Sequence, residues 1–131
     1  MDNTDLEIIR MLRANGREPF VSIAKEIGLT EGAVRARVAK LSKDGTIKRF
    51  TVETKDDVNA VVMVATSRAV STTKVADAIR KLGVHRVYEI SGNFEIICFV
   101  ESNSIEEVNE SVEQIRAIDG VTDTSTSMVL K

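Results

Sequence analysis

A helix-turn-helix pattern at residues 23–38 limits the folds open to this chain more than any other feature. Ala24 is small where two crossing helices must approach closely. Gly28 follows four residues later, where a left-handed backbone costs least without a Cβ, and Thr30 suits the N-cap of a second helix. Such a pair presents its second helix to the major groove of DNA. A solvated amphipathic helix hairpin is the alternative for so short a motif.

The second helix of the pair, expected at 31–43, has an apolar side and a cationic side. Val34, Val38 and Leu41 recur at helical spacing and form one apolar stripe. The basic residues off this stripe are Arg35, Arg37, Lys40 and Lys43. A buried seam with a cationic outer side fits a groove lined by phosphates, although a solvated surface charge is the preferred interpretation of Lys43.

Charge is divided along the chain. Residues 1–50 contain 10 Lys/Arg and 7 Asp/Glu, a net of +3, whereas residues 51–131 contain 8 and 13, a net of −5. Six basic residues lie within 35–49, together with one acid, Asp44. The division indicates that the front part contacts a polyanion and that the rear part has another task. Ordinary scatter of surface charge is the alternative.

Composition is typical of a soluble globular protein, with 43% hydrophobic and 29% charged residues. No apolar run approaches the roughly 18 residues that cross a bilayer, so we expect no membrane partner. One cysteine and one histidine cannot build a zinc site by themselves. Cys98 lies in an apolar run that indicates a buried strand in a reducing cytoplasm, and the acidic N-terminus is unlike a signal peptide.

Three helices are predicted in the front half. Thr4 and Glu7 predict a capping box for the first helix, which ends at Asn15-Gly16. The second helix is expected at about 21–27, after Pro19.

A wing is predicted after the third helix. Residues 47–53 have the pattern of a β-segment, which would make residues 1–53 a winged helix-turn-helix domain. Lys48 and Arg49 in this segment would reach DNA phosphates. Residues 54–57 form the expected linker.

Residues 58–131 predict a β-α-β-β-α-β, ferredoxin-like (RAM-type) domain, and the whole chain an α+β fold. The expected order is a strand at 60–65, a helix capped by Thr72 or Thr73, a strand at 86–91, a tight turn at Gly92-Asn93, a strand at 95–100, a helix with a Ser104/Glu107 capping box and a strand at 122–130. Two helices cover one face of such a sheet. The bare apolar face predicts a homodimer interface.

Motifs in both halves carry a resemblance to one family. They are Asp5-Leu6-Glu7-Ile8-Ile9, Ile23-Ala24 with Gly28-Leu29, Val34-x-x-Arg37-Val38-x-x-Leu41, Gly45-x-Ile47-x-x-Phe50, the run 87–95, and Ile118-x-Gly120-Val121 before Thr124 and Thr126. In this order they resemble the Lrp/AsnC (leucine-responsive, feast/famine) transcription regulators. The resemblance implies a dimer, assembling further into octamers, that binds a pseudo-palindromic double-stranded DNA operator in the nucleoid of the cytoplasm. It also implies a small amino-acid effector, bound where dimers meet, and no other cofactor.

The chain departs from the family pattern at the hairpin turn. The family usually has Gly-Asp-x-Asp, whereas this chain has Gly92-Asn93-Phe94-Glu95. An acidic pair suits the ammonium group of a ligand, and an amide with one acid changes both charge and reach. The identity of the effector is therefore open.

DNA contacts are assigned from the position of each residue on the predicted helices. Residues at the N-terminal end of the recognition helix lie deepest in the groove. We expect Arg35 to pair with guanine O6 and N7. Base edges or their rim are assigned to Thr30, Glu31, Gly32 and Arg35, and phosphates to Ser22, Arg37, Lys40, Lys48 and Arg49.

Effector contacts are implied by the resemblance. They are Ser91, Gly92, Asn93 and Glu95 of the turn, Thr124 and Thr126 of the last strand, and Tyr88 closing the pocket. A free amino acid needs donors for its carboxylate, which a glycine turn offers, and an acceptor for its ammonium, which Glu95 offers. A plain hairpin turn beside a threonine-rich strand is the alternative.

Other functions fit the sequence less well. We predict no enzyme, because no histidine–nucleophile pair, phosphate-binding glycine loop or catalytic carboxylate pair is present. A regulatory subunit of a metabolic enzyme would explain residues 58–131 but not the basic helix-turn-helix. An RNA-binding module needs aromatic residues on central strands, which are aliphatic at 61–64. An effector-independent architectural DNA-binding protein is the alternative within the same fold.

Overall fold

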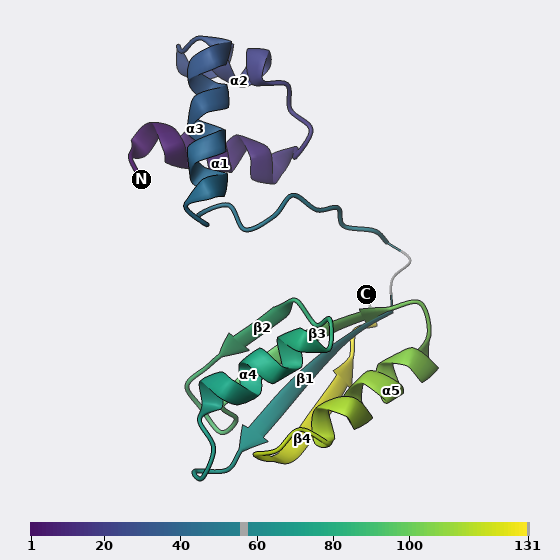
Figure 1. Cartoon of the computed structure of the whole chain (residues 1–131). Helices are drawn as coiled ribbons and strands as arrows, with labels where there is room; N and C mark the ends of the chain where they lie inside the picture. The colour runs from purple at the N-terminus through teal and green to yellow at the C-terminus, as the bar shows by residue number, and fades with distance from the viewer. Residues whose placement is uncertain (56–57, 131) are drawn as a thin grey trace. The chain divides into compact units, whose positions relative to one another are not determined.

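The computed structural model describes residues 1–55 and 58–130, which divide into two compact units, Met1–Glu53 and Thr54–Lys131 (Figure 1). Each unit has a hydrophobic core of its own. Of the predicted linker, residues 56 and 57 lie outside the described residues. No helix in the described ranges is long and apolar enough to cross a membrane.

The first unit is a bundle of α1 (Asn3–Ala14), α2 (Phe20–Ile27) and α3 (Glu31–Lys43). Its core residues are Ile8, Ile23, Ala24, Val34 and Val38. Ala24 is buried, as its small side chain predicted. Gly28 ends α2 with φ 75°, and its N–H donates to the carbonyl of Ala24. The predicted left-handed turn between the two helices is confirmed.

Helix α1 begins earlier than the sequence predicted. Its N-cap is Asp2, whose Oδ1 accepts from the N–H of Asp5 at 2.9 Å, while Asp5 Oδ2 accepts from the N–H of Asp2 at 3.1 Å. The predicted Thr4/Glu7 capping box is wrong. Both pairs have the capping-box spacing, and the helix uses the earlier one because Asp caps better than Thr and its charge suits the N-terminus of a helix.

The predicted wing is also wrong. Residues 47–53 are described and contain no strand, because the first unit offers no second strand with which they can pair. Ile47 instead closes the end of α3: its N–H donates to the carbonyl of Leu41 at 2.9 Å, and its side chain packs on the helical core. The first unit is therefore a helix-turn-helix whose following segment is exposed.

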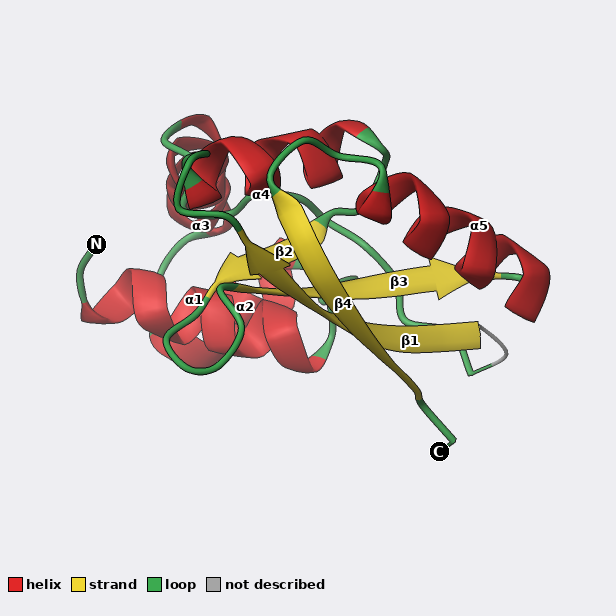
Figure 2. Ribbon diagram, turned by 90° about the horizontal axis from the view of Figure 1, so that it is seen from below, coloured by secondary structure: helices red, strands yellow, loops and turns green. Residues whose placement is uncertain are grey.

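The second unit has the predicted β-α-β-β-α-β order. Its elements are β1 (Val58–Thr66), α4 (Thr72–Lys81), β2 (Arg86–Glu89), β3 (Ile96–Ser102), α5 (Ile105–Arg116) and β4 (Val121–Met128). The strands form one antiparallel sheet in the order β2-β3-β1-β4. Helices α4 and α5 cover the same face of this sheet (Figure 2).

Alternation along the strands separates a covered face from an open one. Val62 and Val64 of β1 and Cys98 of β3 are fully buried and belong to the core under the helices. Burial raises the pKa of the Cys98 thiol to about 11. On the open face Met63 lies opposite Ile97, and both are only half-buried. The expected bare apolar face is present.

The caps of the rear helices differ in part from the prediction. Neither Thr72 nor Thr73 is the N-cap of α4, which is Ser71 without a side-chain hydrogen bond. The hydroxyl of Thr72 lies 3.3 Å from that of Thr66, and the hydroxyl of Thr73 donates to Glu89 Oε1 at 3.0 Å. These hydroxyls are used by neighbouring strands, so they are not free to cap the helix.

The predicted cap of α5 is half right. Ser104 Oγ accepts from the N–H of Glu107 at 3.2 Å, as expected of an N-cap. The Glu107 carboxylate accepts from the hydroxyl of Ser102 and the N–H of Asn103 rather than from Ser104. These two hydrogen bonds lower the pKa of Glu107, and the bond from Ser102 has the larger effect.

Gly120 marks the close approach of β4 to the segment before α4. It has φ 95°, and a Cβ built there would lie 2.8 Å from Cβ of Val70. Its carbonyl accepts from the N–H of Ser67 at 2.7 Å. Only glycine fits both the backbone conformation and the space.

Candidate functional site

Helix α3 has an outer face of small residues with a cation on each side. Gly32, Ala36 and Ala39 are exposed opposite the buried stripe, and by helical geometry Arg35 and Lys40 lie on either side of them. Small side chains let a helix backbone approach base edges, and alanine can contact a thymine methyl group. Ala36 and Ala39 are not among the predicted contacts, although their helical position opposite the apolar stripe could have placed them on this face.

Arg35 is exposed but held by two neighbours. Its Nη2 donates to the Glu31 carboxylate one turn earlier, and its guanidinium carbon lies 5.6 Å from the centroid of the Phe20 ring. The side chain keeps 64% of its surface exposed. These contacts limit its rotamers and leave much of its surface free for a ligand. Phe20 was missed, because nothing in the sequence brings a residue 15 positions away beside Arg35.

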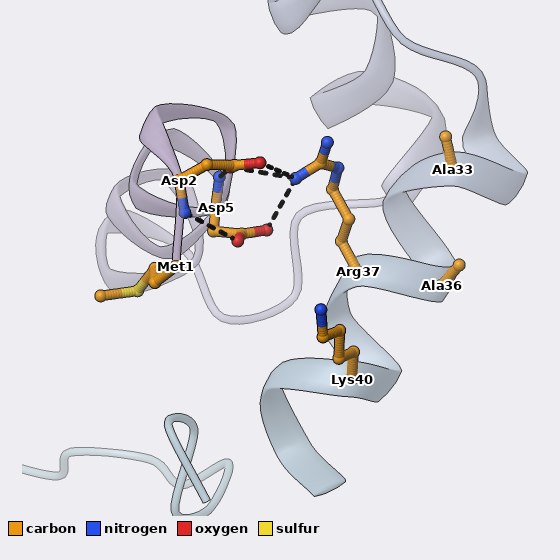
Figure 3. A pocket seen from close by; sticks show the side chains of 7 residues that line it. All are labelled: Met1, Asp2, Asp5, Ala33, Ala36, Arg37 and Lys40. Carbon is orange, nitrogen blue, oxygen red and sulfur yellow. Dashed lines mark hydrogen bonds and ion pairs between the residues drawn. The ribbon is translucent and has the colours of Figure 1, made fainter. Parts of the chain in front are cut away.

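Arg37 is paired with two acids of α1. Its Nη1 donates to Asp2 Oδ1 and Oδ2 at 3.0 and 2.7 Å and to Asp5 Oδ1 at 3.0 Å (Figure 3). The hydrogen bond from Arg37 is the largest cause that lowers the pKa of Asp2 to about 2, and the same bond raises the pKa of Arg37. Both acids belong to the first unit, and their residues are 35 and 32 positions away from Arg37.

A shallow groove separates the N-terminus of α1 from α3. Its lining combines the acid–guanidinium cluster with the adjacent surface of α3: Met1, Asp2, Asp5, Ala33, Ala36, Arg37 and Lys40. Figure 3 shows Arg37 reaching across it to the two carboxylates, with Lys40 one turn further along α3. The groove therefore borders the outer face that carries the predicted DNA contacts.

The remaining predicted DNA contacts lie in three places. Thr30 is the N-cap of α3, and its Oγ1 accepts from the N–H of Ala33 at 3.1 Å. Ser22 is half-buried in the first turn of α2. Lys48 and Arg49 are exposed in the segment after α3. Their contacts with DNA remain predictions.

The predicted effector turn is a loop, Ile90–Glu95, rather than a tight turn. It is closed by a hydrogen bond of 2.9 Å from the N–H of Ile90 to the carbonyl of Glu95. The predicted strand ends at 91 and 95 are therefore wrong, because β2 stops at Glu89 and β3 starts at Ile96. Ser91, Gly92 and Asn93 are exposed at the tip, where Gly92 has φ 142°.

Glu95 attaches this loop to the end of β1. Its Oε2 accepts from the N–H of Thr66 at 3.0 Å, and its own N–H donates to the carbonyl of Val64 at 3.1 Å. In the described part of the chain Oε1 has no hydrogen-bond partner. The half-buried carboxylate thus has one structural oxygen and one oxygen available to a ligand.

The other predicted effector residues lie on the two edge strands of the sheet, β4 and β2. Thr124 and Thr126 lie on the helix-covered face of edge strand β4, opposite Val64 and Val62, and Thr124 Oγ1 accepts from Arg116 of α5 at 2.9 Å.

Tyr88 lies on the open face of the other edge strand, β2. Its ring meets that of Phe99 edge-on, with centroids 6.3 Å apart. Within one chain, Tyr88 and the two threonines are therefore on opposite faces and opposite edges of the sheet.

Comparison with known proteins matches each of the two units to a known domain family. The AsnC-type helix-turn-helix domain matches residues 1–42, and the Lrp/AsnC ligand binding domain matches residues 59–131. The chain belongs to the Lrp/AsnC family. It is a transcriptional regulator with a helix-turn-helix unit in front and the ligand-binding domain of that family behind, as the sequence indicated.

Relatives match over the whole length of the chain. The HTH-type transcriptional regulator LysM of Sulfurisphaera tokodaii is 40% identical over 100% of this chain and 96% of its own length. LysM of Saccharolobus solfataricus is 37% identical over 100% and 94%. The Lrp/AsnC assignment therefore covers both units in one protein.

A solved structure shares the fold. The leucine response regulatory protein LrpA of Mycobacterium tuberculosis aligns with TM-score 0.80 and 20% identity over 100% of this chain and 93% of that one. A second, the feast or famine regulatory protein of M. tuberculosis complexed with L-methionine, aligns with TM-score 0.77 and 20% identity over 99% and 92%. Both support the α+β architecture.

Proposed function

We propose that α3 of this Lrp/AsnC protein reads a specific DNA operator and that a small amino acid bound by the rear unit modulates the binding. The observation that carries the first part is the outer face of α3, where exposed small residues lie between Arg35 and Lys40. A face of this kind brings the backbone close to base edges and places cations at the groove walls.

The roles of the individual residues follow from their positions. Arg35 pairs with a guanine, with Thr30, Glu31 and Gly32 beside it at the start of the helix. Phosphates on either side of the groove are contacted by Ser22, Arg37, Lys40, Lys48 and Arg49. Phosphate contacts set the register, and Arg35 supplies discrimination.

The open sheet face of the second unit supports the proposal that this chain self-associates. The open face of its sheet carries half-buried aliphatic and aromatic side chains, among them Met63, Ile97 and Phe99. A second copy of this chain would cover them, and the resulting dimer, the building block of an octamer, would bind a pseudo-palindromic operator. We place this regulator in the cytoplasm, on the nucleoid, without enzymatic activity and with no cofactor besides its effector.

The effector loop suits a free amino acid. Glu95 has one oxygen without a partner for an ammonium group, and the exposed backbone around Gly92 offers N–H groups for a carboxylate. An M. tuberculosis relative was solved in complex with L-methionine, which is a ligand of this class. Tyr88 or the pair Thr124 and Thr126 would complete the site from another copy.

Selection from a random-sequence duplex library tests the DNA part. The full chain should enrich one motif with two related half-sites about one helical turn, or a multiple of it, apart. Recovery of unenriched sequences, with Kd values equal to that of a random duplex, would show an architectural protein that binds without reading bases.

Thermal-shift screening against the twenty amino acids tests the effector part. A ligand at a hundredfold excess over Kd stabilises the native state by about 2.7 kcal/mol. Glu95→Gln should remove the shift, whereas Glu106→Gln, the same change at an exposed site on α5, should keep it. No shift with any amino acid would favour effector-independent regulation.

A further inference from the structure

The cluster of Asp2, Asp5 and Arg37 has a feature that a purely structural ion pair does not require. Three of the four carboxylate oxygens in it accept from the same nitrogen, Nη1. In the part of the chain that the structure describes, Nε and Nη2 of Arg37 make no hydrogen bond. Figure 3 shows both nitrogens on the side of the guanidinium away from the two carboxylates. Arg37 can therefore bind the acids and donate to a further oxyanion at the same time.

The cluster also borders the outer face of α3. It shares a groove with Ala33, Ala36 and Lys40. The two carboxylates and one guanidinium of the cluster itself carry one net negative charge, and the ammonium group of Lys40 lies beside them. Without Arg37 the two carboxylates would repel a phosphate backbone, and without the carboxylates Arg37 would be a mobile cation. A mobile cation can meet phosphates in any register, which favours sequence-independent binding.

We propose that Asp2 and Asp5 are positioning residues for DNA recognition. They hold Nη1 of Arg37 in place, so that the opposite edge of the guanidinium group contacts one phosphate when α3 is bound in register with the operator. The inference rests on the proposed DNA-reading function and adds two acids that no predicted contact includes. Holding the side chain in place before binding reduces the rotamer freedom that the specific complex would otherwise lose. Cancelling its charge in other registers weakens binding to random DNA.

The variant that tests this is Asp2→Asn/Asp5→Asn in the full chain. Asparagine keeps the oxygens that accept the capping hydrogen bonds of α1, and it is as good an N-cap as aspartate, so the helix start is retained. The control is Glu7→Gln/Glu53→Gln, which removes the same charge from two exposed positions of the first unit. Kd is measured by fluorescence anisotropy against KCl concentration, for the library-selected operator and for a random duplex.

The acid-free variant should bind the random duplex more tightly and with a steeper dependence on salt than the control. The slope of log K against log salt should steepen by about 0.9 for the phosphate that freed Arg37 contacts. Its operator-to-random affinity ratio should fall about fivefold below that of the control. Equal ratios and equal slopes in the two variants would overturn the inference. Failure of the unmodified protein to select any motif would overturn the proposed function itself.

Arg37→Lys keeps the positive charge and provides a second measurement, which does not depend on how the acid-free variant folds. An ammonium bound to the carboxylates has no second, outward edge, whereas the guanidinium does. The operator Kd should weaken about tenfold, the low end for a hydrogen bond to a charged group, and the random-duplex Kd should change less than twofold. An unchanged operator Kd would contradict the assigned geometry.

Discussion

Replacing Arg35 by alanine should remove base discrimination while leaving the fold intact. A bidentate arginine–guanine pair is worth about 1–3 kcal/mol of discrimination, or roughly 5- to 150-fold in affinity ratio. The interactions that Arg35 makes within the protein are weaker. The Arg35 and Glu31 side chains are 64% and 44% exposed, so their pair contributes about 0.2–1 kcal/mol to stability. The cation–π interaction with Phe20 at 5.6 Å adds about 0.5–1 kcal/mol.

Lys43→Ala is the matched control. Lys43 is exposed at the C-terminal end of the same helix, and its replacement removes the same charge. Mobility shifts with the selected operator, and with a duplex carrying each single-base change, give the discrimination of each variant. Arg35→Ala should bind the operator and the duplex altered at its guanine equally well. Lys43→Ala should weaken all duplexes alike, with the same preference as the unmodified protein.

An unchanged base preference in Arg35→Ala would refute the assignment of Arg35 to a base. Size-exclusion chromatography and thermal melting accompany the assay, because a variant that no longer forms its oligomer would bind DNA less tightly for another reason. The same elution volume with a loss of stability below about 2 kcal/mol would show that the change is confined to recognition.

The packing around Gly120, the open face of the rear sheet and the charge of Asp2 can each be tested by one change to the chain. Gly120→Ala should destabilise the protein by about 2–4 kcal/mol in thermal melts, because it places a side chain on a left-handed backbone with its Cβ only 2.8 Å from that of Val70. The control, Gly16→Ala, should be close to neutral, because the nearest atom to its Cβ is 3.8 Å away. Equal losses of stability in the two variants would contradict this prediction. Removal of residues 1–55 should leave a soluble oligomer by light scattering, whereas a monomer would count against the sheet face as the interface. The pKa of Asp2 is lowered from 3.8 to about 2, so the stability that its carboxylate contributes is present above pH 3.8 and is lost as the pH falls to about 2. The melting temperature of Asp2→Asn should therefore depend less steeply on pH in that range than that of the unmodified protein. Parallel curves of melting temperature against pH for the two proteins would contradict the prediction.

The sequence predicted those parts of the fold that depend on local signals. The bounds of α3, the cap by Thr30 and the left-handed Gly28 follow from side-chain chemistry within a few residues, and all three are confirmed. The order of strands and helices in the rear unit follows from periodicity in the same way.

The sequence predictions were wrong where a residue's local preference lacks the partner it needs, or where other residues of the fold engage the same group. Residues 47–53 have strand-forming side chains, but a strand needs a neighbour, and the first unit has none. Thr72 and Thr73 could cap α4, but their hydroxyls pair with Thr66 and Glu89 instead. Propensity shows what a residue can do, and tertiary neighbours decide which of its options is used.

In the candidate site, too, features within one helix could be predicted, whereas contacts between helices could not. The cations of α3 could be identified from one helix, so Arg35 and Arg37 are both among the predicted DNA contacts. The partners that orient them could not be found, because Asp2 and Phe20 come from other helices and no spacing rule connects them with α3.

The two edges of the rear sheet have a consequence for sensing. Tyr88 and Thr126 cannot touch the same small molecule in an isolated chain, since the strands β3 and β1 lie between them and their side chains point to opposite sides. A metabolite that needs both must be shared by neighbouring copies. The apparent affinity of the protein for that metabolite would then increase with the concentration of the protein. The metabolite concentration to which the cell responds would therefore depend on how much regulator it has made.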